Sequence, residues 1–206
     1  MKKHKIKELW VIFWTALVLF TVFSIHKTEA KELTIGVNGR IRSYSEDPVY
    51  FKEQIAILKD STEKDRITIV ISSEGGSIST ANTLIRAIKE AKGHTRVLVF
   101  GYAASAAAAI ALSADEFRYV LPSKILFHAL KYNFDGRIEL APMKIRALWL
   151  HYYEELAGVV LFTGEELGKM LDYGDIEISG EELTKRLQQG HSRLVKYTSD
   201  DPHDYD

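Results

Sequence analysis

The sequence predicts an α/β domain in which a mostly parallel sheet packs against helices. Two observations predict it. β-Branched runs such as ITIVIS (67–72) alternate along the chain with amphipathic helical segments, and no repeat or linker divides the residues after about 30. Runs of this kind are typical of parallel strands buried on both faces, and right-handed crossovers join them. We therefore expect one domain with helices on both faces of its sheet.

The elements follow in order from turn signals and periodicity. Strands are expected at 32–41, 67–72, 96–100, 116–120 and 124–129, the first ending in a turn at Asn38–Gly39. Helices are expected at 47–59, 79–92, 105–113, 141–157 and 180–189. Asp47 and Pro48 suit the start of the helix at 47–59, and Gly93 suits the end of the one at 79–92. The domain is thus predicted over residues 31–198, and the acidic residues 199–206 as a disordered tail.

The N-terminus predicts export. Four lysines precede seventeen uncharged residues, Leu9–Ile25, and Thr28 and Ala30 then stand at the spacing of a cleavage site. Residues 1–30 are therefore expected to be either a cleaved signal peptide or a membrane anchor, because seventeen residues lie at the lower limit for a spanning helix. In both cases the domain lies outside the cytoplasm, in the periplasm or held at the membrane facing outward.

Composition excludes several function classes. The chain has no cysteine, so disulfides, thiolate catalysis and cysteine-bound metals are excluded, and no HExxH pair predicts a metal site. A net charge of −1 gives no general attraction to nucleic acid. The Gly75–Gly76 pair is not followed by a Lys-Ser/Thr pair, and GxGxxG is missing, so nucleotide binding is not expected and no cofactor is predicted.

Ser105 is the first candidate for chemistry. It follows a predicted buried strand and opens an alanine-rich helix, in the segment GYAASAAAAIALSAD (101–115). A helix N-terminus offers free N–H groups and a positive dipole end, and small neighbours allow a substrate backbone to approach. A serine in this place can equally be an N-cap, and the segment alone does not separate the two roles.

Two further segments suit a serine nucleophile. Gly75 and Gly76 follow the strand at 67–72, and adjacent glycines permit a backbone whose N–H groups point outward, as an oxyanion hole needs. His128 lies in an otherwise apolar strand, 23 residues after Ser105, where it is either a core residue or a general base.

The order SSEGG, GYAAS, LP-x5-H and TG…D-x3-S resembles the Clp protease proteolytic subunit, over residues of about 33 to 190. The resemblance implies the Clp/crotonase ββα-superhelix fold, with Ser105 as nucleophile and His128 as base. It also implies that the backbone N–H groups of Gly76 and Ala106 form the oxyanion hole. The implied partner is a peptide or protein substrate, and a homo-oligomer is compatible with it.

The acid of the triad has two candidates. The family places an aspartate shortly before a stretch like DIEISGEEL (175–183), which selects Asp175. Asp172 is the rival, because the stretch after the Thr-Gly pair is about two residues short. This sequence also departs from the family at Glu74, where a proline is usual. Its charge would stand beside the oxyanion hole and oppose a developing anion.

The expected function is an extracytoplasmic, ATP-independent serine endopeptidase with a Ser-His-Asp triad. One alternative is a Ser/Lys enzyme that resembles signal-peptide peptidases and uses Lys144. The other is a non-catalytic binding or scaffold protein on the same fold, which Glu74 favours. The apolar stripe Ile145, Leu148, Trp149, Tyr152 and Leu156 is expected to serve packing or a subunit interface.

Overall fold

The computed structural model describes residues 29–134, 137–172 and 174–189. The chain divides into two units between Ala30 and Lys31, and the description below concerns the second unit. The apolar segment 9–25 and the acidic tail 199–206 lie outside the described residues. In the part of the chain that is described, no helix has the length and hydrophobicity to span a membrane.

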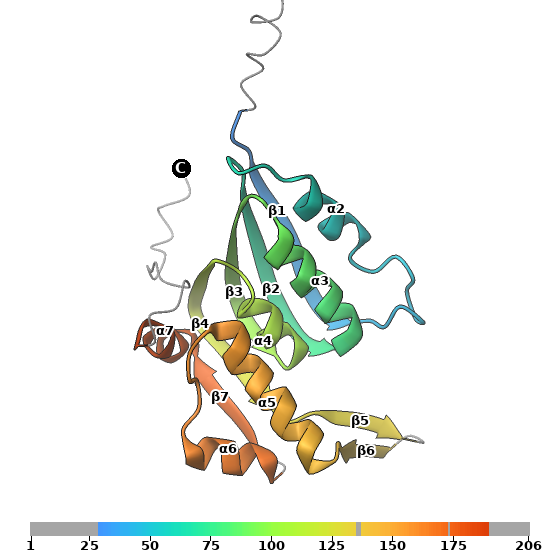
Figure 1. Cartoon of the computed structure of the whole chain (residues 1–206), viewed down its shortest axis with the longest axis vertical. Helices are drawn as coiled ribbons and strands as arrows, with labels where there is room; N and C mark the ends of the chain where they lie inside the picture. The colour runs from blue at the N-terminus through green and yellow to red at the C-terminus, as the bar shows by residue number, and fades with distance from the viewer. Residues whose placement is uncertain (1–28, 135–136, 173, 190–206) are drawn as a thin grey trace, which may run out of the picture. The chain divides into compact units, whose positions relative to one another are not determined.

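The predicted mostly parallel sheet is confirmed. Five strands stand in the order β1-β2-β3-β4-β7 (Figure 1). The first four pair in parallel, whereas β7 runs antiparallel to β4. The strands are β1 (Glu32–Ile41), β2 (Arg66–Gly76), β3 (His94–Ala104), β4 (Glu116–His128) and β7 (Asp175–Ser179).

Six helices and a separate hairpin complete the described fold. The helices are α2 (Lys52–Asp60), α3 (Ile78–Glu90), α4 (Ala106–Ala111), α5 (Met143–Ala157), α6 (Gly164–Leu171) and α7 (Gly180–Gln189). The hairpin consists of β5 (Lys131–Phe134) and β6 (Arg137–Leu140), which pair antiparallel between β4 and α5 in the chain.

For the described residues, the expectation of helices on both faces of the sheet is wrong. In Figure 1, α2, α3, α4 and α5 lie on the same side of the sheet. Burial agrees, because Ile69 and Val97 face the helices and are fully buried, whereas Thr68, Val70 and Leu98 on the other face are only half-buried. β-Branched side chains suit either face of a strand, so a run such as ITIVIS indicates a strand but not burial on both sides.

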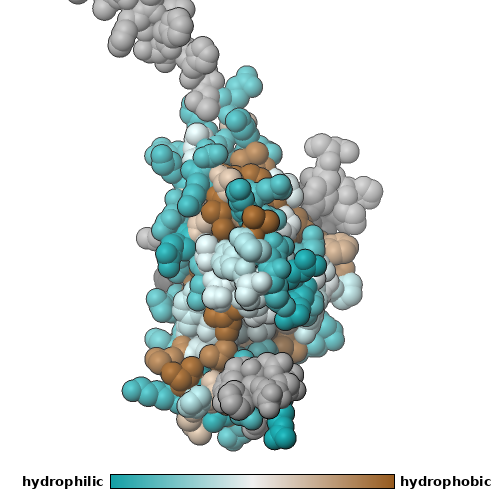
Figure 2. Space-filling model, turned by 90° about the vertical axis from the view of Figure 1, so that its right-hand side faces the viewer, coloured by the Kyte–Doolittle hydropathy of each residue, from teal (hydrophilic) through white to brown (hydrophobic). Residues whose placement is uncertain are grey.

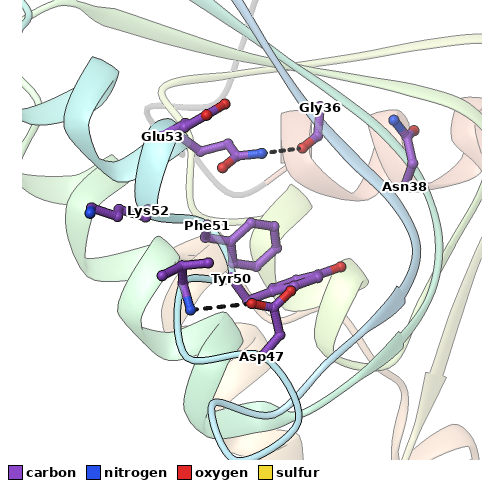
Figure 3. A pocket seen from close by; sticks show the side chains of 9 residues that line it. Gly36, Asn38, Asp47, Tyr50, Phe51, Lys52 and Glu53 are labelled. Atoms are coloured by element: carbon purple, nitrogen blue, oxygen red, sulfur yellow. Dashed lines mark hydrogen bonds between the residues drawn. The ribbon is translucent and has the colours of Figure 1, made fainter.

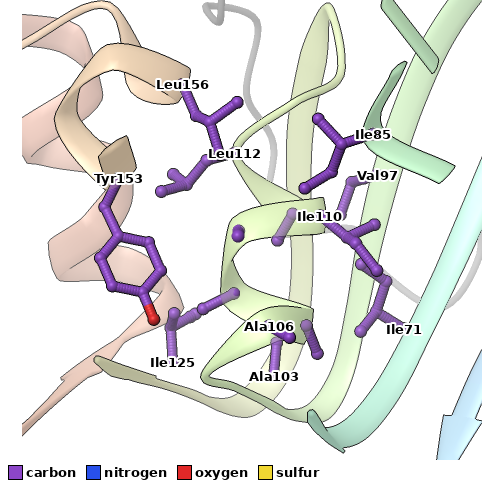
Figure 4. Close-up of a cluster of buried hydrophobic side chains, with 14 of the residues drawn as sticks. Ile71, Ile85, Val97, Ala103, Ala106, Ile110, Leu112, Ile125, Tyr153 and Leu156 are labelled. Carbon is purple, nitrogen blue, oxygen red and sulfur yellow. The ribbon is translucent and has the colours of Figure 1, made fainter. Parts of the chain in front are cut away.

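Helix α4 lies at the centre of the core, as the alanine run permits. All its residues are fully buried, and it contacts β1, β2, β3 and β4. Figure 4 shows Ile110 of α4 among Ile71 of β2, Ile85 of α3 and Val97 of β3. Methyl side chains let the α4 backbone come close to the sheet, and this places the residue before α4 at the sheet end.

Several predicted boundaries change. The strands expected at 116–120 and 124–129 are the single strand β4. At its irregular middle, the Ser123 hydroxyl contacts the carbonyl of Val120 in β4 and that of Val99 in the neighbouring β3. The turn expected at Asn38–Gly39 is a register shift within β1. The helix expected at 47–59 begins only at Lys52, because 47–51 form turns and Phe51 has a left-handed φ of 64°.

Three elements were not predicted: the β5–β6 hairpin, helix α6 and strand β7. Helix α6 had a readable signal, since Thr163 and Glu166 form a complete capping box, each side chain accepting from the other's backbone N–H. Strand β7 is a five-residue edge strand with alternating burial, which is a weak signal in a sequence.

Candidate active site

Ser105 occupies a strained turn between β3 and α4. Its φ and ψ are 55° and −121°, and Phe51 is the other described non-glycine residue with positive φ. Its side chain makes no capping hydrogen bond to α4, whereas its carbonyl accepts from the Ala109 N–H at 3.1 Å. Helix capping therefore does not explain a serine here, and a strained strand-to-helix turn is a known way to expose a nucleophile.

A backbone hydrogen bond joins the Ser105 turn to β4, the strand that carries His128. The Ser105 N–H donates to the Leu126 carbonyl at 2.9 Å, and Ala104 pairs with Leu126 in the parallel β3–β4 ladder. His128 follows two residues later, at the last position of β4. Ser105 and His128, which are 23 residues apart in sequence, therefore lie at the same end of the sheet.

Of the paired glycines, Gly75 lies against the Ser105 turn and Gly76 lies against Ile41 at the end of β1. A Cβ atom on Gly75 would stand 2.4 Å from the Ala104 carbonyl oxygen and 3.0 Å from the Ala106 nitrogen. On Gly76 it would stand 2.3 Å from the Ile41 carbonyl oxygen. Both residues have positive φ, 85° and 142°. The end of β2 thus comes this close to the start of α4 at Gly75, and to β1 at Gly76, only because these two positions have no side chain.

A Gly75→Ala substitution should destabilise the domain by about 3 kcal/mol and distort the Ser105 turn, through backbone strain and overpacking. Gly101→Ala is the matched control, because Gly101 has a similar φ of 81° but nothing within 4 Å of its Cβ position. The control should cost about 1 kcal/mol, for its left-handed backbone alone. Urea unfolding of both variants measures the difference, and equal losses would contradict the close approach.

His128 is half-buried, and its Nδ1 makes a hydrogen bond to the backbone. Nδ1 lies 2.6 Å from the carbonyl oxygen of Ala129, which can only accept, so Nδ1 carries the proton and Nε2 is an acceptor. Burial lowers the pKa of His128 below its ordinary 6.5, and Lys131 adds to this, while the Ala129 hydrogen bond and Asp175 oppose it. Within the described residues, no hydrogen bond joins His128 to Ser105.

Asp175 lies directly opposite His128 in the antiparallel β4–β7 ladder. Its carboxylate nevertheless accepts a hydrogen bond from Lys131, the first residue of the β5–β6 hairpin, with Nζ 3.0 Å from Oδ1. Asp172 is the exposed C-cap of α6, and its N–H donates to the carbonyls of Gly168 and Lys169. Of the two candidate acids, Asp175 is thus the neighbour of the histidine and Asp172 the helix-end residue.

Glu74 points away from the Ser105 turn. It is exposed, whereas Ser73 and Gly75 on either side are buried. The Ser73 hydroxyl accepts from the Gly75 N–H at 3.1 Å and donates to the Gly39 carbonyl, which shapes this strand end. The alternation along β2 therefore directs the Glu74 charge to the solvent side.

The sequence analysis missed Tyr153 of α5. This residue is fully buried, and its hydroxyl accepts from the indole N–H of Trp149 at 3.1 Å. The residues of the predicted apolar stripe on this helix differ in burial: Trp149 and Leu156 are buried, whereas Ile145 and Leu148 are exposed. A usable signal existed, because a tyrosine on the buried side of a helix needs a partner for its hydroxyl.

The remaining candidates lie elsewhere. Lys144 is exposed in the first turn of α5, and within the described residues no three acidic or histidine side chains gather as metal ligands. A pocket of about 520 Å³ lies between β1 and segment 47–54, lined by Asp47, Tyr50 and Lys52 among others, and includes no candidate residue (Figure 3). The face on the α2 side is mostly hydrophilic with scattered apolar patches (Figure 2).

A protein-family model matches the chain. The family model described as Clp protease matches residues 21–155, more than half of the 206 residues. The matched range includes Gly75, Gly76, Ser105 and His128 and ends before Asp175. No curated protein gives a significant match to the chain.

Proposed function

Because the chain belongs to the Clp protease family, a family of peptidases, we propose that it is a serine peptidase with Ser105 as nucleophile and His128 as general base. The observation that supports this most is the Ser105 turn. The Ser105 side chain is free of a capping role, Gly75 packs against the turn, and His128 lies at the same sheet end. Helix α4 does not require a serine in this strained conformation, and backbone strain at a non-glycine residue favours a functional role for that residue.

In the proposed reaction, the Ser105 oxygen attacks a peptide carbonyl while His128 Nε2 takes the serine proton. His128 then returns that proton to the leaving amine. The N–H groups of Gly76 and Ala106 are the proposed donors to the oxyanion. Ala106 is the first residue of α4, so its N–H has no acceptor within the helix, and the helix dipole favours negative charge there.

We propose Asp175 as the third member of the triad. Its position opposite His128 suits this role, and its carboxylate would have to leave Lys131 to reach the imidazole. The Ala129 carbonyl already holds His128 in the tautomer that a general base needs. An aspartate would add stabilisation of the imidazolium that forms during turnover.

Family members act on peptides or proteins and usually form oligomers. We propose a peptide or protein substrate for this chain, hydrolysed without ATP, because an enzyme outside the cytoplasm would not meet a cytoplasmic ATP-driven unfoldase. The basic and apolar N-terminus supports a proposed location outside the cytoplasm. The exposed Met143 and Leu148 of α5 offer an apolar surface for self-association.

The test is covalent labelling with a fluorophosphonate, followed by mass-spectrometric mapping of the adduct. We expect one adduct, on Ser105, because the probe reacts with an activated serine and not with an ordinary hydroxyl. Heat-denatured protein is the control and should not react. An adduct on a different serine, or none on the folded protein, would overturn the proposal.

A non-catalytic binding protein on the same fold is the second candidate. Two observations favour it: Asp175 is paired with Lys131, and among the described residues Ser105 and His128 share no hydrogen bond. This candidate expects the folded protein to leave the fluorophosphonate unreacted. The labelling experiment therefore separates the two functions.

A further inference from the structure

A buried serine lies at an irregularity of the sheet, just before the glycine pair. From Asn38 to Arg40, two positions along β1, the paired strand β2 advances three positions, from 72 to 75. An extra residue of this kind disrupts the hydrogen bonds of a ladder locally. Ser73 of β2 lies at this interruption on the buried side of the strand, with 2% of its surface exposed.

The Ser73 hydroxyl makes two hydrogen bonds across the interruption. It donates to the Gly39 carbonyl of β1 at 2.5 Å and accepts from the Gly75 N–H at 3.1 Å. Both directions are fixed, because a carbonyl can only accept and an N–H can only donate. One hydroxyl therefore joins the neighbouring strand to the turn that leads into the glycine pair.

This turn needs such a restraint because its residues are glycines. Gly75 and Gly76 have φ of 85° and 142°, and a glycine pair in a free chain adopts many other conformations about as readily. The Ser73 bond fixes the peptide before Gly75, while Gly75 itself packs against the Ala104 carbonyl and the Ala106 nitrogen. The direction of the next N–H group, that of Gly76, follows from these restraints.

We propose that Ser73 is a positioning residue, whose hydroxyl holds the glycine turn so that the Gly76 N–H points at the developing oxyanion. This inference rests on the proposed peptidase function. Because Ser73 already accepts from the Gly75 N–H, the proposed oxyanion donor is the N–H of Gly76 and not that of Gly75. A donor lowers the barrier most when it is held in place before the charge develops, and the buried Ser73 supplies this restraint without touching substrate.

Ser123 of β4 provides a matched control. It is as buried as Ser73, at 3% exposure, and lies where the β3–β4 register shifts. Its hydroxyl accepts from the Gly101 N–H at 3.3 Å and contacts the Val99 carbonyl of β3 at 3.0 Å. Gly101 has a φ of 81°, close to that of Gly75. The two serines thus make the same kinds of bond, but Ser123 does not hold the glycine pair.

The test compares Ser73→Ala with Ser123→Ala in the full chain, below the melting temperature of both variants. We expect Ser73→Ala to lower kcat on fluorescein-labelled casein, and the fluorophosphonate labelling rate, by about 30-fold, less than the 10²–10³-fold that complete loss of an oxyanion donor costs. KM should not change, because Ser73 does not touch substrate. Ser123→Ala should react like the wild type, although its loss of buried hydrogen bonds should lower its melting temperature to a similar extent.

If Ser73→Ala does not fold, Ser73→Cys replaces it, because a thiol preserves the side-chain shape but forms only weak hydrogen bonds, and it should lower kcat by about tenfold. Wild-type kcat in the folded Ser73 variant, a change in KM alone, or an equal fall in Ser123→Ala would overturn the role of Ser73 and leave the peptidase function standing. A wild type that does not label with the fluorophosphonate would overturn the peptidase function itself, and this inference with it.

Discussion

Replacing Ser105 with alanine should abolish casein hydrolysis, with a loss in kcat on the order of 10⁴-fold or more. The reason is that Ser105 supplies the oxygen of the acyl intermediate in the proposed mechanism. The measurement is kcat on fluorescein-labelled casein at saturating substrate, at a temperature below the melting temperature of each variant.

Stability is the control for this variant. Alanine at position 105 inherits the same backbone angles, 55° and −121°, so the strain of the turn stays in both proteins and the melting temperature should hardly change. Ser79→Ala is a matched serine control, because Ser79 is exposed on the first turn of α3 and makes no contact with the Ser105 turn in the described structure. Residual hydrolysis in Ser105→Ala that exceeds about 1% of the wild type would point to another nucleophile.

Replacing His128 with alanine should lower kcat by about 10⁴-fold, because in the proposed mechanism the serine then has no base to take its proton. Lys144→Ala should leave kcat unchanged, since Lys144 is exposed at the start of α5 and a histidine base does not need it. The reverse pattern would establish the Ser/Lys alternative. Equal activity of both variants and the wild type would exclude either residue as the base.

The pH profile of kcat reports the same histidine. A base must be neutral, and the neutral form of an imidazole is present above its pKa. Because the pKa of His128 is lowered, activity should persist below pH 6.5 and fall only at more acidic values. Lys131→Met should move this acid limb to higher pH, because it removes a cation that lowers the pKa and frees the Asp175 charge that raises it.

The candidate site was predictable in part because its signals are local. The glycine pair marks a place where no side chain fits, and the structure shows why: Gly75 meets the Ala104 carbonyl and Gly76 the Ile41 carbonyl. Ser105 was readable from the strand-to-helix junction and the alanines after it. Whether its side chain capped the helix depended on backbone angles, which a sequence does not display.

The proposed acid, Asp175, was harder to predict because its place beside His128 depends on pairing between distant segments. Asp175 faces His128 only through the antiparallel addition of β7 to the edge of the sheet, across 47 residues of chain. Lys131 reaches the same carboxylate from the β5–β6 hairpin, an element without a clear signal in the sequence. Spacing within one segment left both Asp172 and Asp175 as candidates for the acid. The register of β7 places Asp175 opposite His128, whereas Asp172 lies at the end of α6.

By itself, the sequence determined that a serine follows a buried strand, that glycines precede it on the neighbouring strand and that a histidine closes the next one. These are properties of short segments, whose periodicity and turn residues are read directly. The tertiary structure alone decided the rest. Among the described residues, it placed the helices on one face of the sheet, released the Ser105 side chain from capping and paired Asp175 with Lys131. The physical reason is that such contacts depend on the register and packing of segments far apart in the chain, where several partners compete for the same side chain.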